Sequence, residues 1–137
     1  MALVLSEEQE LLKDSAVEFL NDNSPVTHMR EMRDTKDSVG FSRALWKEMA
    51  ELGWIGIIFP EAYGGAEMGY AELGILLEES GRRLSPYPLL STIVLGGGAL
   101  MAGGSEEQRA KILPGVCAGD TLLSLAFQER GDQKSVV

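Results

Sequence analysis

The stretch Phe59–Gly65, FPEAYGG, separates two segments of helical periodicity and decides how the chain folds. Pro60 fixes its own φ and biases the residue before it toward an extended conformation, so no helix runs through this point. Gly64 and Gly65 allow positive φ and close backbone approach, while Tyr63 offers a large ring with a polar tip. The sequence therefore predicts a rigid, tightly packed corner between two helices.

Outward from this corner, apolar residues recur at helical spacing in five segments, with caps, glycines or prolines at their ends. The five predicted helices cover residues 6–21, 41–53, 70–81, 88–101 and 105–114. Ser6 with Gln9, and Ser105 with Gln108, match the capping-box pattern. We expect Pro114 to end or kink the last helix. Residues 24–40 are polar and predict a connecting loop with one short helical turn near 28–33.

The texture changes at Thr121–Gln128, a short apolar run between Asp120 and Glu129. Such a run predicts a β-strand rather than another helix. A lone strand leaves its backbone groups unpaired, so we expect it to join a sheet formed by residues outside this sequence. The prediction is thus an all-α domain of about five to six helices over residues 1–120, with residues 121–137 beginning a β-domain.

Composition excludes several classes of protein. The 137 residues carry a formal net charge of −9, which argues against nucleic-acid binding. The longest mostly apolar run, Leu89–Met101, is too short to cross a bilayer, and residues 1–5 lack the features of a signal peptide. Cys117 is the only cysteine and His28 the only histidine, so neither a disulfide framework nor a zinc site is expected. A lone cysteine fits a reducing cytoplasm.

The corner belongs to a longer motif. Leu52–Gly65 resembles the "LG…G…PE-x-YGG" signature near the start of acyl-CoA dehydrogenases. Three further stretches agree in order and spacing: Leu5–Gln9 with "LTEEQ", Leu77–Arg82 with "LEELGR", and Ser105–Asp120 with "GTEEQK…LP…AAGE". Together these stretches span nearly the whole chain, so it is identified as similar to the N-terminal helical domain of that family.

The resemblance implies an FAD-dependent oxidoreductase that introduces an α,β double bond into an acyl-CoA thioester. In the family a glutamate base from a C-terminal helical domain removes the α-proton while hydride leaves the β-carbon. No catalytic residue is therefore expected in this chain, and residues 121–137 would open the middle β-domain. The implied partners are an acyl-CoA substrate, electron-transfer flavoprotein or a similar acceptor, and further subunits in a homo- or hetero-oligomer.

The segment Leu125–Gly131 resembles the family's "A-x-TEP-x-AGSD" stretch, which approaches the flavin ring. By position, the resemblance implies that Leu125, Phe127 and Gln128 contact FAD. Gln128 stands where the family has threonine, and Arg130 where it has proline. A glutamine amide can still donate a hydrogen bond to a flavin carbonyl or nitrogen.

Three consecutive glycines, Gly96–Gly98, lie inside the predicted helix at 88–101, where each costs about 1 kcal/mol relative to alanine. Close helix packing is one explanation, and room for an acyl chain is another. They are no phosphate-binding loop, because no strand precedes them and no Lys-Ser/Thr pair follows. The resemblance implies that this helix lines the acyl cavity, with Leu95, Gly96, Ala99 and Leu100 as lining residues.

Gly81–Leu90, GRRLSPYPLL, resembles a "GRxLxPxPLL" pattern in a branch that handles bulky, steroid-side-chain or dicarboxylic acyl groups. Two alternatives stay open. One is a non-catalytic helical assembly module that shares the fold, which the departures at Gln128 and Arg130 favour. The other is the N-terminal part of a related flavin oxidase, acting on acyl-CoA or nitroalkanes.

Overall fold

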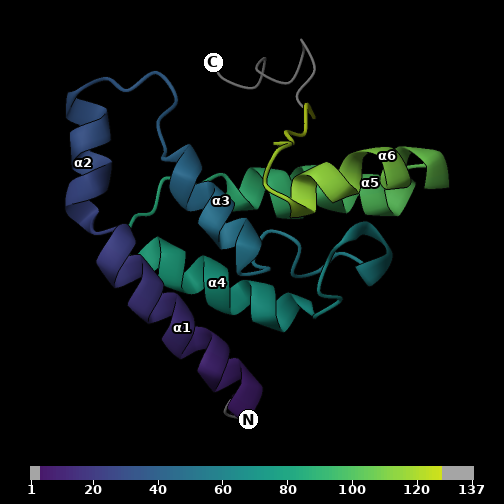
Figure 1. The fold of residues 1–137 in the computed structure, drawn as a ribbon, viewed down its shortest axis with the longest axis horizontal. Coiled ribbons are helices and arrows are strands. Elements are labelled where there is room, and N and C mark those ends of the chain that lie inside the picture. Colours follow the sequence, from purple (N-terminus) through teal and green to yellow (C-terminus); the bar gives the residue numbers. More distant parts are fainter. Residues whose placement is uncertain (1–3, 128–137) are drawn as a thin grey trace, which may run out of the picture.

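The computed structural model describes residues 4–127, which fold into six α-helices with one 3-10 turn and one π-helical run (Figure 1). In chain order these are α1 (Glu7–Asn23), α2 (Val26–Asp34), α3 (Arg43–Glu51), η1 (Glu61–Tyr63), α4 (Tyr70–Arg82), η2 (Leu90–Gly97), α5 (Gly98–Gly103) and α6 (Glu106–Cys117). The predicted all-α architecture is confirmed. The short turn predicted near residues 28–33 is a full helix, α2.

Helices α1 and α4 lie side by side (Figure 1). The capping box predicted at Ser6 forms, since its hydroxyl accepts from the Gln9 amide and the Gln9 side chain accepts from the Ser6 amide. The same Gln9 side chain donates to Glu72 Oε1 on α4 at 2.8 Å. The start of α1 is therefore tied to its neighbour, and Ala16 and Leu20 are fully buried farther along the helix.

One hydrophobic core joins α1, α3, α4 and α6 to the corner. Its largest fully buried side chains are Trp46, Phe59, Leu20, Met49, Ile55, Ile57, Leu73, Leu76, Ile93, Leu113 and Val116. Pro60 biases Phe59 toward an extended backbone, so no helix passes through the corner. The Phe59 side chain instead packs in the core among residues of several helices. The corner thus contributes to the core as well as connecting α3 to α4.

The corner itself is closed by backbone hydrogen bonds. The Ala66 amide donates to the Gly56 carbonyl at 3.0 Å, and the Met68 amide donates to the Ile57 carbonyl at 2.8 Å. Gly64 has φ of +85°, a conformation that favours glycine. A Cβ on Gly65 would lie 2.0 Å from the Phe59 carbonyl oxygen. The predicted tightly packed corner is confirmed.

The predicted helix at residues 88–101 is divided into η2 and α5. At the junction the Gly98 amide donates to the Ile93 carbonyl five residues earlier, the spacing of a π-helix. The last helix, α6, does not end at Pro114 but continues to Cys117. Proline removes one backbone donor, and the Ala118 amide resumes the helical pattern by donating to the Pro114 carbonyl at 3.0 Å.

Residues 121–127 form neither helix nor strand, whereas the sequence predicted a strand from 121 to 128. A strand requires a partner to satisfy its backbone ladder, and no other described segment is a strand. The assignment of residues 121–137 to a β-domain stays a prediction, and residues 128–137 lie outside the described part. Between residues 4 and 127, no helix is long and apolar enough to cross a membrane.

Candidate functional site

The three consecutive glycines face three different surroundings. A Cβ on Gly96 would lie 2.4 Å from Leu123 Cβ, and one on Gly97 would lie 2.4 Å from Phe59 Cζ. A Cβ on Gly98 would meet no other atom within 4 Å. Close packing therefore explains the first two glycines: Gly96 seats the segment after α6, and Gly97 seats the ring from the corner.

The residues predicted to line an acyl cavity differ in exposure. Leu95 keeps 36% of its surface exposed, and Ala99, one turn further along, is exposed as well. Leu100 is partly buried and packs against the core, while Gly96 is covered by Leu123. Leu95 and Ala99 thus present an open apolar surface on η2 and α5, bordered by Leu123.

The residues predicted to contact flavin follow Leu123 directly. Leu125 is 38% exposed and Phe127 is 67% exposed, so two apolar side chains face solvent within four residues of the partly buried Leu123. Gln128 lies outside the described residues. Through the contact between Leu123 and Gly96, the structure brings the segment of the predicted flavin residues beside the helix of the predicted acyl-binding residues.

The described part of this segment fits the apolar portion of FAD. An isoalloxazine ring presents a broad apolar face, and the exposed Leu125 and Phe127 side chains match it in chemistry. Among residues 4–127, the segment offers no charged side chain after Asp120 for a pyrophosphate. These residues could therefore touch the ring of FAD, while its phosphates would need other partners.

Sequence reasoning missed Thr92. This side chain is completely buried in η2, and its hydroxyl lies 3.4 Å from both the amide nitrogen and the carbonyl oxygen of Leu123. The hydroxyl can accept from the amide and donate to the carbonyl, although both distances are long for hydrogen bonds. The signal available in the sequence was a polar residue inside an apolar run, since a buried hydroxyl needs a partner.

Contacts with Gly115 and Lys47 hold residues 118–121, the start of the segment that leads to Leu125. The Asp120 and Thr121 amides both donate to the Gly115 carbonyl at 2.9 Å. Lys47 Nζ, on α3, donates to the Ala118 carbonyl at 2.8 Å and also pairs with the Asp120 carboxylate. The chain leaving α6 is therefore attached to three elements before it reaches Leu125.

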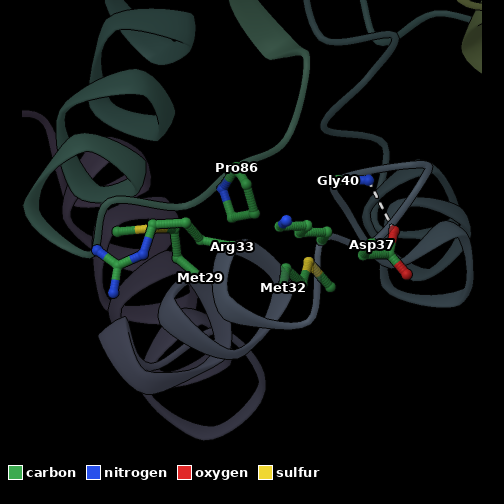
Figure 2. Close-up of a pocket in the computed structure, with 7 residues that line it drawn as sticks. Met29, Met32, Arg33, Asp37, Gly40 and Pro86 are labelled. Atoms are coloured by element: carbon green, nitrogen blue, oxygen red, sulfur yellow. Dashed lines mark hydrogen bonds between the residues drawn. The ribbon is translucent and has the colours of Figure 1, made fainter.

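A separate shallow pocket of about 290 Å³ lies between α2, the loop that follows it and Pro86 (Figure 2). Its lining residues are Met29, Met32, Arg33, Lys36, Asp37, Gly40 and Pro86. Arg33 is engaged by its neighbour, with Nε 2.9 Å from Asp34 Oδ1. None of the residues predicted to bind flavin or acyl groups lines this pocket, so it is distinct from the candidate site.

Comparison with known proteins agrees with the resemblance. The family "Acyl-CoA dehydrogenase, N-terminal domain" matches residues 6–120. The 2-methylacyl-CoA dehydrogenase, mitochondrial, of Solanum tuberosum is 31% identical over 140 residues, covering 99% of this chain and 33% of that protein. The chain spans about a third of the length of such curated relatives.

Solved structures agree in fold. A variant of the Tcur3481-Tcur3483 steroid ACAD is 38% identical with a TM-score of 0.79, covering 91% of this chain and 34% of that one. The ChsE4-ChsE5 complex from Mycobacterium tuberculosis is 27% identical with a TM-score of 0.81, covering 96% of this chain and 36% of that one. The family match covers most of the chain, and this chain therefore belongs to the acyl-CoA dehydrogenase family, as its N-terminal helical domain.

Proposed function

We propose that this chain is the helical part of an FAD-dependent acyl-CoA dehydrogenase, in which it supplies one wall of the acyl cavity. Leu95, Gly96, Ala99 and Leu100 form that wall, and Leu125, Phe127 and Gln128 contact the flavin. One observation carries the proposal. The Leu123–Gly96 contact supports it, because it brings the segment that leads to Leu125 and Phe127 beside the helix that carries Leu95 and Ala99, although 27 positions separate the two contact residues in sequence.

The chemistry of the family requires this proximity. When bound, FAD accepts the hydride that leaves the β-carbon of the acyl group, so the acyl chain has to lie against the flavin ring. Leu95 and Ala99 exclude water from one side of the acyl chain, and Leu125 and Phe127 cover part of the ring. The base that removes the α-proton comes from a domain outside this chain.

The substrate class that fits best is a bulky acyl group of the steroid-side-chain type. Two observations support this choice: the GRRLSPYPLL pattern at residues 81–90, and 38% identity to a steroid ACAD. The open apolar surface at Leu95 and Ala99 suits a wide hydrophobic group, because neither position carries a side chain larger than leucine.

Partners follow the same logic. A similar protein has been solved as a ChsE4-ChsE5 complex, and we propose that this chain also works in a homo- or hetero-oligomer. Electron-transfer flavoprotein or a similar acceptor would reoxidise the flavin. A cytoplasmic location stays a prediction, since the relative from Solanum tuberosum is named mitochondrial.

The test uses the complete protein with its co-purified partners. We expect a flavin absorption spectrum that bleaches when a steroid-side-chain acyl-CoA is added, and slower bleaching with a straight-chain acyl-CoA. A Leu95→Trp variant should lower kcat/KM for the bulky substrate roughly tenfold, because the larger ring narrows the wall. The matched control is Leu11→Trp, at a 69% exposed position on α1, which should leave kcat/KM unchanged.

Other results would point to the alternatives. A colourless protein that does not take up added FAD would favour a non-catalytic assembly module. Hydrogen peroxide formed in proportion to substrate consumed would favour an oxidase. Equal effects of Leu95→Trp and Leu11→Trp would contradict the placement of the acyl wall, even if the protein is a dehydrogenase.

A further inference from the structure

The short connection after α6 ends in a contact with η2. Residues 118–123 leave α6 and cross to η2, where the amide and carbonyl of Leu123 lie 3.4 Å from the Thr92 hydroxyl. Beyond this point the side chains of residues 124–127 are all exposed. Leu123 is thus the last residue that the described helices hold.

Two glycines allow the segment after α6 to lie close to the helices: Gly96 faces Leu123, and Gly115 faces Thr121. On η2, a Cβ at Gly96 would lie 2.4 Å from Leu123 Cβ and 3.2 Å from its carbonyl carbon. On α6, a Cβ at Gly115 would lie 2.6 Å from Thr121 Oγ1. Real Cβ atoms essentially never lie within 3.0 Å of another heavy atom, so an alanine at Gly96 would push Leu123 away from η2, and one at Gly115 would displace the Thr121 hydroxyl.

Thr92 adds a polar contact to this packing. Its hydroxyl faces the amide and the carbonyl of the same residue, Leu123, as a neighbouring strand would. A buried, β-branched side chain has few rotamers, so the hydroxyl has a defined position beside the two peptide units that meet at Leu123. The π-helical run that carries Thr92 and Gly96 belongs to a class of structure often found at functional sites.

We infer that Thr92, Gly96 and Gly115 are positioning residues, which seat Leu123 and thereby set where Leu125 and Phe127 meet the flavin. This inference rests on the proposed function. Leu125 lies only two residues beyond Leu123, and an extended chain advances at most about 3.3–3.6 Å per residue. A held Leu123 therefore confines Leu125 to a small volume, whereas a released segment lets both apolar side chains move away from the ring.

The first measurement is amide hydrogen exchange over residues 121–127 in the intact protein, which needs no flavin. Thr92→Val keeps the shape of the side chain and removes the hydroxyl, so exchange at Leu123 should rise about fivefold. Gly96→Ala should raise it roughly tenfold or more, and Gly115→Ala, whose Cβ meets only the Thr121 hydroxyl closely, should raise it by less. Thr92→Ser, which restores the hydroxyl, should return exchange toward the unmodified value. Gly98→Ala is the matched control, with nothing within 4 Å of its Cβ.

The second measurement is the dissociation constant of FAD and the absorbance maximum of the bound flavin. Gly115→Ala is informative here, because it disturbs the segment at Thr121 without touching the proposed acyl wall. We expect Thr92→Val, Gly96→Ala and Gly115→Ala to weaken FAD binding several-fold and to shift the absorbance maximum. Gly98→Ala should change neither quantity.

The outcomes separate the two proposals. Faster exchange at Leu123 with an unchanged flavin spectrum and affinity would overturn the positioning role and leave the proposed function standing. Unchanged exchange in Thr92→Val and Gly96→Ala would overturn the inference directly. An unmodified protein with protected residues 121–123 that takes up no FAD would contradict the proposed function, and the flavin role of these residues with it.

Discussion

The corner between α3 and α4 and the region formed by α2 and its following loop satisfy their backbones by different means. In the corner, the carbonyls of Gly56, Ile57 and Phe59 accept from amides of residues 66–68, and Trp54, Ile55 and Ile57 are buried. In the α2 region, no residue of the helix is buried, and residues 33–40 are all exposed. There the bonds are local, such as Thr35 Oγ1 donating to the Glu31 carbonyl at 2.7 Å.

The difference separates hydrogen bonding from packing as sources of stability. Both regions pair their backbone groups, but only the corner couples that pairing to the hydrophobic core through Phe59. A change in the corner must therefore disturb several helices, whereas a change in the α2 region can be absorbed locally. Proteins keep adaptable surfaces in regions of the second kind, and the pocket at Met29 and Met32 lies there (Figure 2).

The largest effect should come from filling the corner. Gly65→Ala would place a Cβ 2.0 Å from the Phe59 carbonyl oxygen and 2.5 Å from its carbonyl carbon. Both are backbone atoms, so the corner itself would have to move, and we expect the free energy of unfolding to fall by more than about 3 kcal/mol. Urea denaturation followed by circular dichroism measures the loss.

The control is another glycine within an element. Gly74, on α4, has nothing within 4 Å of its added Cβ, so Gly74→Ala should be neutral or stabilise the protein by about 0.5–1 kcal/mol. Similar losses in Gly65→Ala and Gly74→Ala would mean that the corner is no more tightly packed than an exposed helix face.

Tyr87 lies at the border of the two regions and gives the next largest effect. Its ring contacts Phe41 at 6.1 Å between centroids, and its neighbour Pro86 lines the α2 pocket. Burial raises the pKa of Tyr87 to about 12 against an opposing effect of the nearby Ser24 hydroxyl, and among residues 4–127 no atom meets the geometry of a hydrogen bond to the Tyr87 hydroxyl. The unfolded phenol ionises near pH 10, so stability is retained below that pH and lost as pH rises from about 10 to about 12.

Comparison with Tyr87→Phe isolates this loss. The difference in unfolding free energy between the two proteins should change by on the order of 2 kcal/mol between pH 9 and pH 12, to the disadvantage of the tyrosine. At pH 7 the phenylalanine should be equal or slightly more stable, because it removes an unpaired buried hydroxyl. Parallel pH profiles for both proteins would show that the ring is not held in the core under alkaline conditions.

The sequence predicted the parts of the fold that depend on local chemistry. Ser6 and Ser105 were recognised as caps from side-chain spacing alone, and both form capping boxes. The corner followed from proline and glycine, whose allowed backbone angles are known in advance. Two elements differ from the prediction: α2 is a full helix although none of its residues is buried, and residues 121–127 are no strand because a strand needs a partner.

The candidate site was harder to predict for the same reason. The run Gly96–Gly98 was visible in the sequence, yet only the structure distinguishes a glycine under Leu123 from one facing open space. Thr92 was missed because its importance comes from a residue 31 positions away. The predicted contacts of Leu125, Phe127 and Gln128 with flavin, and of Leu95, Gly96, Ala99 and Leu100 with an acyl group, stay predictions.

The smallest effect should come from the loop after α2. Asp37 Oδ1 accepts from the Gly40 amide at 2.7 Å and from the Val39 amide at 2.8 Å, as the dashed line in Figure 2 shows for Gly40. The bond from Gly40, followed by the bond from Val39, holds the pKa of the Asp37 carboxyl below its ordinary value. Their contribution to stability is present above the unfolded pKa near 4 and is lost as pH falls through the lower folded value.

Asp37→Ala should therefore raise hydrogen exchange at the Val39 and Gly40 amides while lowering Tm by less than about 2 °C. Asp37→Asn keeps an acceptor oxygen and should lie between the alanine variant and the unmodified protein in exchange. The loop bonds lie outside the core, so amides of α1 and α4 should exchange at unchanged rates. A loss in Tm comparable to that of Gly65→Ala would mean that the α2 region unfolds together with the corner, because only a shared cooperative unit passes a loop defect to the whole domain.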